Sequence, residues 1–263
     1  MKVLKFGGTS VANPENINKV KSILAQQNEQ QIAVVVSAFG GVTDVLLTAS
    51  QAAAQQDINY KNSLQEIEDR HISAIRELIP VKSQSAALSK VKSELNVLET
   101  HLEGSFLIGE ITPKLSDKIV SYGELLSSFI ISEFLKSEGL DVAFKDSREL
   151  IITDNQFGKA NVDFATTNAN FKAYFDTAKH QITLLPGFVA SSKSGDLTTL
   201  GRGGSDYTAA IIAAGVNADI LEIWTDVSGM YTANPKLVKQ AKCVAHISYQ
   251  EAMELSHFGA KVL

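Results

Sequence analysis

The chain has 263 residues, of which 44% are hydrophobic, so it is long enough to form one α/β domain with a substantial core. Its 24 basic and 29 acidic residues give a net charge of −5, and no segment combines clustered lysines with aromatic residues, which argues against nucleic acid and anionic membranes as partners. The single cysteine, Cys243, excludes an intrachain disulfide and a thiolate zinc site and favours a reducing compartment.

The N-terminal part of the chain repeats one pattern, in which a short apolar strand is followed by a glycine pair and then by a helix. Residues 3–6 predict a strand that ends at Gly7–Gly8, after which Asn13 and Pro14 are typical of an N-cap and a first helical residue. The apolar, β-branched run 32–36 predicts a second strand, buried on both faces, which ends before Gly40–Gly41. Another helix is expected over residues 42–56.

The middle of the chain is polar and helical in pattern. Residues 59–110 carry apolar stripes at helical spacing, which predicts a pair of amphipathic helices beside the sheet with no part in the chemistry. A long helix is expected over residues 116–137, ending at Gly139 as the C′ glycine, and residues 141–144 begin another strand.

The remaining pattern alternates strands with helices. Short strands or loops are expected around 151–152, a helix at 162–178, strands at 182–185 and 187–190 on either side of Pro186, a helix at 205–214 and a strand at 220–224. This alternation predicts a largely parallel sheet with helices on both faces. We expect a cytoplasmic protein, because the sequence has no signal-peptide pattern and no run of about 18 apolar residues.

Three glycine-rich turns fall where a parallel sheet binds ligands, at the carboxyl ends of its strands. They are residues 7–10, 40–41 and 201–205. Glycine allows backbone N–H groups to approach a ligand closely, and the helix that follows favours negative charge, so each turn is a candidate phosphate site. One such turn alone is more often only a tight turn, and the hypothesis therefore depends on all three together.

Charged residues accompany these turns. Lys5 lies two residues before the first turn and Arg202 lies within the third, where each could bind phosphate or carboxylate, although either could also be a surface cation. Asp206 and Asp226 follow a turn and a strand, and Asp206 could equally be an ordinary acid at a helix start. The sequence has no P-loop, no GxGxxG fingerprint and no protein-kinase motif, and its histidines lack metal-binding spacing, so phosphate binding must use another architecture.

Five strings spread over the whole chain carry a family resemblance. They are KFGGTS at residues 5–10, SYGE at 121–124, LGRGGSDYTA at 200–209, IWTDVSGMYTANP at 223–235 and SYQEAMELSHFGAKVL at 248–263. Together they resemble aspartokinase, of the amino acid kinase family. The last string is particularly similar to the kinase portion of bifunctional aspartokinase–homoserine dehydrogenases.

The resemblance implies an α/β fold, a three-layer αβα sandwich around a largely parallel sheet of the carbamate kinase-like type. It implies one catalytic domain over residues 1–263, with an amino-acid-binding lobe over about 1–195 and a nucleotide-binding lobe over about 196–263. The implied reaction is ATP-dependent phosphorylation of the β-carboxylate of L-aspartate, which opens the biosynthesis of lysine, threonine and methionine. ATP and Mg²⁺ are the implied cofactors, with the ion held mainly by phosphates and Asp206 as its one candidate protein ligand.

The resemblance also implies residue roles. Lys5 would stabilise the transferring phosphoryl group, and Asp206 would orient Lys5. The amino acid would be bound by Thr43, Glu124, Arg202 and Ser205. The nucleotide would be bound by Lys5, Gly7, Gly8, Ser37, Gly40, Gly41, Thr225, Asp226, Tyr231, Lys236 and Lys261. Lys236 takes this place because the chain has lysine where many relatives have arginine after the proline.

The sequence ends at FGAKVL, where family members continue into regulatory domains of the ACT type. We therefore expect an isolated catalytic domain without feedback control by lysine or threonine, from a parent that forms a homodimer or a larger assembly. Two alternatives stay open at this point. One is a kinase of another amino acid or carboxylate on the same fold, and the other is a non-catalytic sensor of an amino acid or nucleotide.

Overall fold

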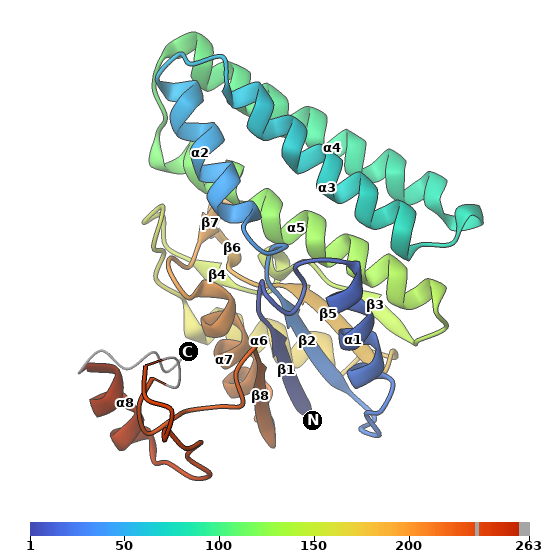
Figure 1. Ribbon diagram of the computed structural model, residues 1–263, viewed down its shortest axis with the longest axis vertical. Coiled ribbons are helices and arrows are strands. Elements are labelled where there is room, and N and C mark those ends of the chain that lie inside the picture. The colour runs from blue at the N-terminus through green and yellow to red at the C-terminus, as the bar shows by residue number, and fades with distance from the viewer. Residues whose placement is uncertain (235–236, 258–263) are drawn as a thin grey trace. The chain divides into compact units, whose positions relative to one another are not determined.

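The computed structural model describes residues 1–234 and 237–257. The chain forms two compact units, Met1–Trp224 and Thr225–Leu263, which are described separately below. Figure 1 shows the elements of both units along the chain. The expected lobe boundary near residue 195 concerns ligand binding and stays a prediction.

The first unit is built on a parallel sheet of five strands, in the order β3-β5-β2-β1-β8. The strands are β1 (Lys2–Phe6), β2 (Ile32–Val36), β3 (Val142–Phe144), β5 (Ile182–Pro186) and β8 (Ile220–Trp224). In the register of the central strand, Lys5 lies between Val35 of β2 and Ile223 of β8. The ends of β1 and β2 that precede the glycine-rich turns therefore lie side by side.

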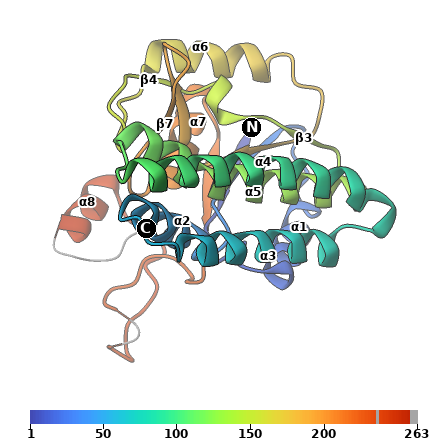
Figure 2. The same cartoon turned by 90° about the horizontal axis from the view of Figure 1, so that it is seen from above.

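Helices cover both faces of this sheet (Figure 2). The core on one face contains α1 (Pro14–Leu24) and α5 (Pro113–Ser137), and α2 (Val42–Ala54), α3 (Tyr60–Leu78) and α4 (Val81–Ile108) pack in turn against α5. The core on the other face contains α6 (Phe164–Phe175) and α7 (Gly204–Gly215). Side chains alternate along β1, so that Leu4 and Phe6 join the first core and Val3 the second. The predicted α/β class, with a largely parallel sheet between two helical layers, is confirmed.

Capping residues explain several helix boundaries. The Asn13 side chain accepts from the Asn16 N–H at 2.9 Å, and Pro14 begins α1 as predicted. The long helix α5 begins at Pro113, three residues earlier than predicted, because the Thr112 hydroxyl caps it by accepting from the Leu115 N–H at 3.2 Å. Beyond its end Gly139 has a φ of 85°, as predicted for a C′ glycine.

A second, smaller sheet was not predicted as such. It contains β4 (Ile152–Thr153), β6 (Val189–Ser192) and β7 (Leu197–Thr199), with β6 and β7 antiparallel. A single 3₁₀ turn, η1 (Ser147–Glu149), precedes it in the chain. These strands are short and rich in serine and threonine, so hydrophobic alternation gave little signal for them.

The second unit contains an antiparallel bridge between Tyr231 and Cys243 and the helix α8 (Tyr249–His257). Before α8, the Ser248 N–H donates to the Glu251 carboxylate at 2.8 Å and the Glu251 N–H to the Ser248 hydroxyl at 3.3 Å, which is a capping box.

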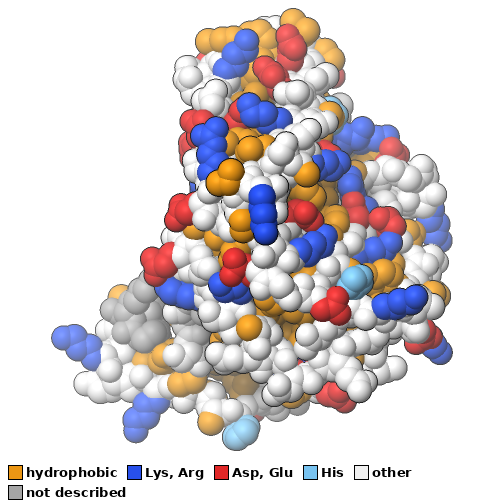
Figure 3. Space-filling model, turned by 90° about the vertical axis from the view of Figure 1, so that its right-hand side faces the viewer, with side chains coloured by type: hydrophobic (Ala, Val, Ile, Leu, Met, Phe, Trp, Pro, Cys, Tyr) orange, Lys and Arg blue, Asp and Glu red, His pale blue; other side chains and the backbone are white. Residues whose placement is uncertain are grey.

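Within residues 1–234 and 237–257, no helix is long and apolar enough to span a membrane. On the face shown in Figure 3, basic and acidic side chains are interspersed.

Candidate active site

The first two glycine-rich turns lie against each other at the carboxyl ends of β1 and β2. A Cβ atom on Gly8 would lie 3.3 Å from the Ala38 carbonyl oxygen, and one on Gly40 would lie 3.1 Å from the Gly8 carbonyl oxygen and 3.0 Å from the Ala12 Cβ. Glycine is needed at both positions because the two backbones approach too closely for a side chain. The site is therefore built on paired turns of fixed spacing.

Lys5 is the charged residue of the central strand, and it is buried. Alternation along β1 directs its side chain to the α7 side of the sheet, where Nζ lies 2.7 Å from Asp206 Oδ1. The Lys5 side chain is 9% exposed and that of Asp206 is 30% exposed. Asp206 lies in the first turn of α7, where the helix dipole favours a carboxylate. The structure thus brings together the two residues expected to act in catalysis, with a counter-ion for a buried ammonium group.

The turns that follow β1 and β2 also carry backbone donors. The N–H groups of Gly8, Gly40 and Gly41 have no hydrogen-bond partner among the described residues. Two other predicted contacts use their N–H groups within the protein, since Ser37 donates to the Phe6 carbonyl at 3.1 Å and Gly7 to the Trp224 carbonyl at 3.4 Å. Ser37 can therefore offer its hydroxyl to a ligand. Gly7 lies directly beside the Lys5 ammonium group, since a Cβ there would be 3.4 Å from Lys5 Nζ.

Glu124 on α5 is a buried carboxylate, only 5% exposed, and its Oε2 has no hydrogen-bond partner. Burial raises the pKa of Glu124 to about 8, although a hydrogen bond from the Ala38 N–H and the charge of Lys5 both act to lower it. Gly123 brings the helix close, because a Cβ there would lie 2.8 Å from the Ala38 Cβ and 3.7 Å from Thr43 Oγ1. A cation bound here would satisfy the free oxygen and favour the ionised carboxylate.

The third glycine-rich turn contacts the end of β5. A Cβ on Gly187 would lie 2.6 Å from Ser205 Oγ, and one on Gly204 would lie 2.6 Å from Phe188 Cδ2. Phe188 has a φ of 68°, unusual for a bulky residue, and its N–H donates to Thr208 Oγ1 at 2.9 Å. This strained turn holds Ser205 beside the end of β5.

Arg202, in the same loop, is exposed and has no partner among the described residues. Its guanidinium group is therefore free to bind an anion. Sequence reasoning had predicted Arg202 and Ser205 at the site but not the Phe188 turn that positions Ser205.

Asp117 is a second buried carboxylate that the sequence reasoning missed. Its oxygens accept from the Gly158 N–H at 2.9 Å, the Thr199 N–H at 3.0 Å and the Thr199 hydroxyl at 2.9 Å. The pKa of Asp117 is raised, because burial disfavours its charged form more than these hydrogen bonds favour it. Asp117 lies seven residues before Glu124, two turns along one face of α5, and that spacing was the available signal. It ties the helix that carries Glu124 to the strand that leads to Arg202.

The predicted nucleotide residues of the second unit are Thr225, Asp226 and Tyr231. Thr225 and Asp226 are exposed, and the Thr225 hydroxyl donates to Asp226 Oδ1 at 3.1 Å. Tyr231 is half-buried in its bridge with Cys243. Lys236 and Lys261 lie outside the described residues.

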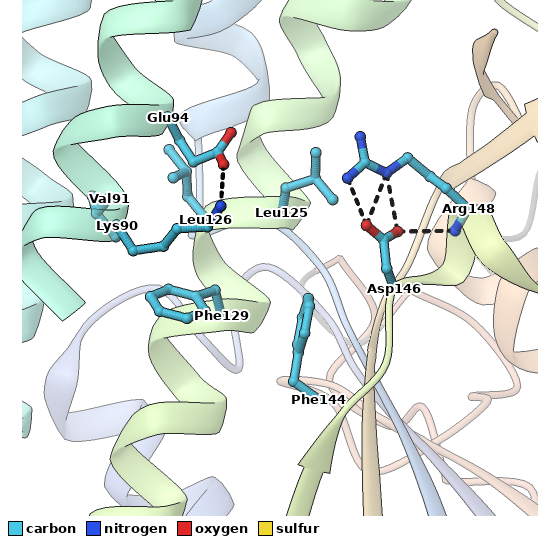
Figure 4. A pocket seen from close by; sticks show the side chains of 9 residues that line it. All are labelled: Lys90, Val91, Glu94, Leu125, Leu126, Phe129, Phe144, Asp146 and Arg148. Atoms are coloured by element: carbon cyan, nitrogen blue, oxygen red, sulfur yellow. Dashed lines mark hydrogen bonds and ion pairs between the residues drawn. The ribbon is translucent and has the colours of Figure 1, made fainter. Parts of the chain in front are cut away.

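A separate pocket lies between α4, α5 and β3 (Figure 4). It has a volume of about 110 Å³ and a mostly apolar lining that includes Phe129 and Phe144. Its charged side chains are already paired, Lys90 with Glu94 at 2.6 Å and Asp146 with Arg148 at 2.5 Å. The pocket contains none of the residues predicted for the site. Because its charged side chains pair with each other, they offer a ligand no unpaired charge.

Comparison with known proteins gives one family over the whole chain. Residues 1–263 match the model of the Amino acid kinase family. The chain is 34% identical over 262 residues to bifunctional aspartokinase/homoserine dehydrogenase 2 of Zea mays, covering 99% of this chain and 29% of that protein. It is 33% identical over 268 residues to aspartokinase 1 of Arabidopsis thaliana, covering 99% of this chain and 46% of that protein.

Among solved structures, E. coli aspartokinase III in complex with aspartate and ADP matches with a TM-score of 0.90 at 32% identity. The match covers 100% of this chain and 57% of that one. The chain thus spans less than a third of the maize relative and little more than half of the E. coli enzyme.

Proposed function

The chain belongs to the amino acid kinase family, and from this premise we propose that it transfers the γ-phosphoryl group of ATP to the β-carboxylate of L-aspartate, forming 4-phospho-L-aspartate. The observation that carries the proposal is that an ammonium group on β1 and a buried carboxyl group on α5 both lie near the turns that follow β1 and β2. Lys5, paired with Asp206, offers a cation, and Glu124 offers a buried carboxylate with a free oxygen. The likeness to an aspartokinase that binds aspartate and ADP supports this assignment.

Lys5 supplies positive charge to the transferring phosphoryl group. Phosphoryl transfer depends mainly on positioning and on electrostatic stabilisation, and a carboxylate acceptor needs no general base. Asp206 keeps the ammonium group of Lys5 oriented, and the free N–H groups of Gly8, Gly40 and Gly41 donate to phosphate oxygens. These groups act most strongly on the charge that develops during transfer.

Glu124 binds the ammonium group of aspartate in this proposal. The exposed guanidinium of Arg202 binds its α-carboxylate, and the hydroxyls of Thr43 and Ser205 complete the amino acid site. Thr225, Asp226 and Tyr231, with Lys236 and Lys261, are proposed to bind the nucleotide on the strength of the resemblance alone.

Magnesium fits the proposed site through Asp206. No group of three or more His, Cys, Asp or Glu side chains within the described residues could hold a metal ion. Mg²⁺ in nucleotide sites commonly needs only one or two carboxylates in addition to phosphates. Asp206 is the carboxylate that would reach the ion, which when bound with ATP neutralises phosphate charge.

A substrate comparison tests the proposal. ADP formation by the 263-residue chain is measured with MgATP and, in turn, L-aspartate, L-glutamate and N-acetyl-L-glutamate. Turnover only with aspartate supports the assignment. Equal or faster turnover of glutamate indicates a different amino acid kinase, and nucleotide binding without turnover indicates a sensor.

The wider setting also belongs to the proposal. We expect the reaction to serve amino acid biosynthesis, as the names of the relatives imply. A cytoplasmic location and a homodimeric or larger parent stay predictions, and several relatives are chloroplastic.

A further inference from the structure

Two successive residues of α3 hold the second glycine-rich turn, although the polar pattern of this helix predicted no chemistry. Arg70 donates from Nη2 to the backbone carbonyl oxygen of Gly40 at 2.7 Å, and the same nitrogen reaches the Ala12 carbonyl oxygen at 3.5 Å. The buried His71 stacks its ring on Phe39, with centroids 5.0 Å apart and an angle of 17° between the planes. Helix α3 runs beside α2, which the turn precedes (Figure 1).

The Gly40–Gly41 peptide is the part of the turn that most needs such support. Glycine on both sides of a peptide bond leaves the peptide plane free to rotate, because neither neighbour has a Cβ to oppose rotation. The bond is trans, so its C=O and N–H point in opposite directions. Because Arg70 binds the Gly40 oxygen, the Gly41 N–H is directed away from Arg70, and it has no partner among the described residues.

We propose that Arg70 is a positioning residue that fixes this peptide plane so that the Gly41 N–H donates to the phosphoryl group of a nucleoside triphosphate. The inference rests on the proposed function. It assigns helix α3, which the sequence pattern left without a chemical role, a part in organising the site. With the plane reversed, the turn would present a carbonyl oxygen to the phosphates, which repels them. Gly41 also has a φ of 80° at the N-cap of α2, a conformation that suits glycine and that the fixed plane maintains.

The size of the effect follows from the bond that is lost. A hydrogen bond from a charged donor changes a conformational equilibrium by about 10- to 100-fold. Arg70→Met therefore lowers kcat about tenfold or more, while the KM for aspartate changes less than about threefold, because Glu124 and Arg202 are untouched. Arg70→Lys keeps a charged donor and restores part of kcat. Arg76→Met is the control, since Arg76 is exposed on the same helix and its side chain has no hydrogen bond or ion pair with the residues that the structure describes.

A glycine-labelling experiment observes the peptide directly. When the 263-residue chain is labelled with glycine carrying both ¹³C in its carbonyl group and ¹⁵N, the carbonyl-filtered amide spectrum contains only the second residue of each Gly-Gly pair. These residues are Gly8, Gly41 and Gly204. We expect the non-hydrolysable ATP analogue AMP-PNP with Mg²⁺ to shift the Gly41 signal of the unsubstituted chain. In Arg70→Met we expect Gly41 to be displaced or broadened before ligand is added, with Gly204 unchanged.

Several results would overturn the proposal. One is a kcat for Arg70→Met equal to that of Arg76→Met, and another is an unchanged Gly41 signal in a variant that has lost turnover. If Arg70→Met does not fold by circular dichroism, Arg70→Lys and Arg70→Gln decide by the same two readouts. If the unsubstituted chain does not phosphorylate aspartate, the proposed function fails, and the Gly41 signal with AMP-PNP still decides the role of Arg70.

Discussion

Replacing Glu124 by glutamine tests how the amino acid site recognises a cation. Glutamine has nearly the same shape and can still accept from the Ala38 N–H, but it carries no charge. The pKa of Glu124 is raised by burial to about 8, so at pH 7 the carboxyl group is mostly protonated in the ligand-free protein. Binding the ammonium group of aspartate then requires the carboxyl group to release its proton.

The magnitude follows from that pKa. At pH 7, ionising a group of pKa about 8 costs about 1.4 kcal/mol, or a factor of about ten in apparent affinity, and about 0.9 proton is released for each aspartate bound. The dissociation constant for aspartate should therefore fall about ninefold from pH 6 to 7 and about fivefold from pH 7 to 8. In Glu124→Gln the dependence disappears, and affinity at pH 8 falls about 10- to 100-fold because a charged hydrogen bond is lost.

The free energy of unfolding should decrease as the pH rises, whereas the affinity for aspartate increases. Because the folded-state pKa is raised above its ordinary value of 4.5, this carboxyl group favours folding below about pH 4.5, and the contribution is lost as the pH rises to about 8. Relative to Glu124→Gln, the unsubstituted chain should lose about 1.4 kcal/mol of unfolding free energy per pH unit across that window. Glu133→Gln is the control, because Glu133 lies on the same helix in a surface ion pair with Lys136.

Isothermal titration calorimetry in buffers of different ionisation enthalpy measures both the affinity and the proton release. Urea unfolding between pH 5 and pH 8 measures the stability difference. The reasoning is refuted if aspartate affinity does not depend on pH between 6 and 8, or if Glu124→Gln releases the same number of protons. A stability difference that stays flat with pH would refute the pKa assignment separately.

Three further substitutions test the rest of the site. Lys5→Met should lower kcat about 100- to 1000-fold, as the loss of one charge-stabilising donor does, while ADP binding measured by calorimetry stays within a few-fold; near-normal turnover would contradict the role of Lys5. Asp206→Asn should lower kcat about tenfold or more in steady-state assays, because Lys5 loses its counter-ion. An unchanged kcat would contradict the role of Asp206 in orienting Lys5. Asp117→Asn should raise the KM for aspartate about tenfold with a smaller change in kcat, because Thr199 and Gly158 lose an acceptor. An unchanged KM in a folded variant would show that Asp117 is structural only.

The parts of the fold that the sequence predicted well are those with strong local signals. The strands β1 and β2 are short apolar runs that end at glycine pairs, and Asn13 with Pro14 marks the start of α1. Lys5 was identifiable because a lysine inside an apolar strand needs a partner, and the structure places Asp206 beside it. Each of these features can be recognised within a few residues of sequence.

The parts that were missed depend on contacts between distant residues. The Asp117 carboxylate binds Gly158 and Thr199, which are 41 and 82 positions away. Arg70 reaches Gly40 from a helix whose pattern was that of a solvated surface. No local pattern reports such contacts, because they arise only when the sheet brings the turns together. Of the short strands, β7 was missed, β4 was expected only as a strand or a loop, and β6 was expected at 187–190, because their polar residues do not alternate with apolar ones.

The central claim is phosphorylation of the β-carboxylate of aspartate, and identification of the product tests it most directly. The 263-residue chain is incubated with MgATP and L-aspartate, and the mixture is treated with borohydride, which reduces an acyl phosphate to an alcohol. The account predicts homoserine, formed only with ATP and lost in Lys5→Met. Formation of 3-amino-4-hydroxybutanoate, which would come from the α-carboxylate, or the absence of any reduced product would contradict it.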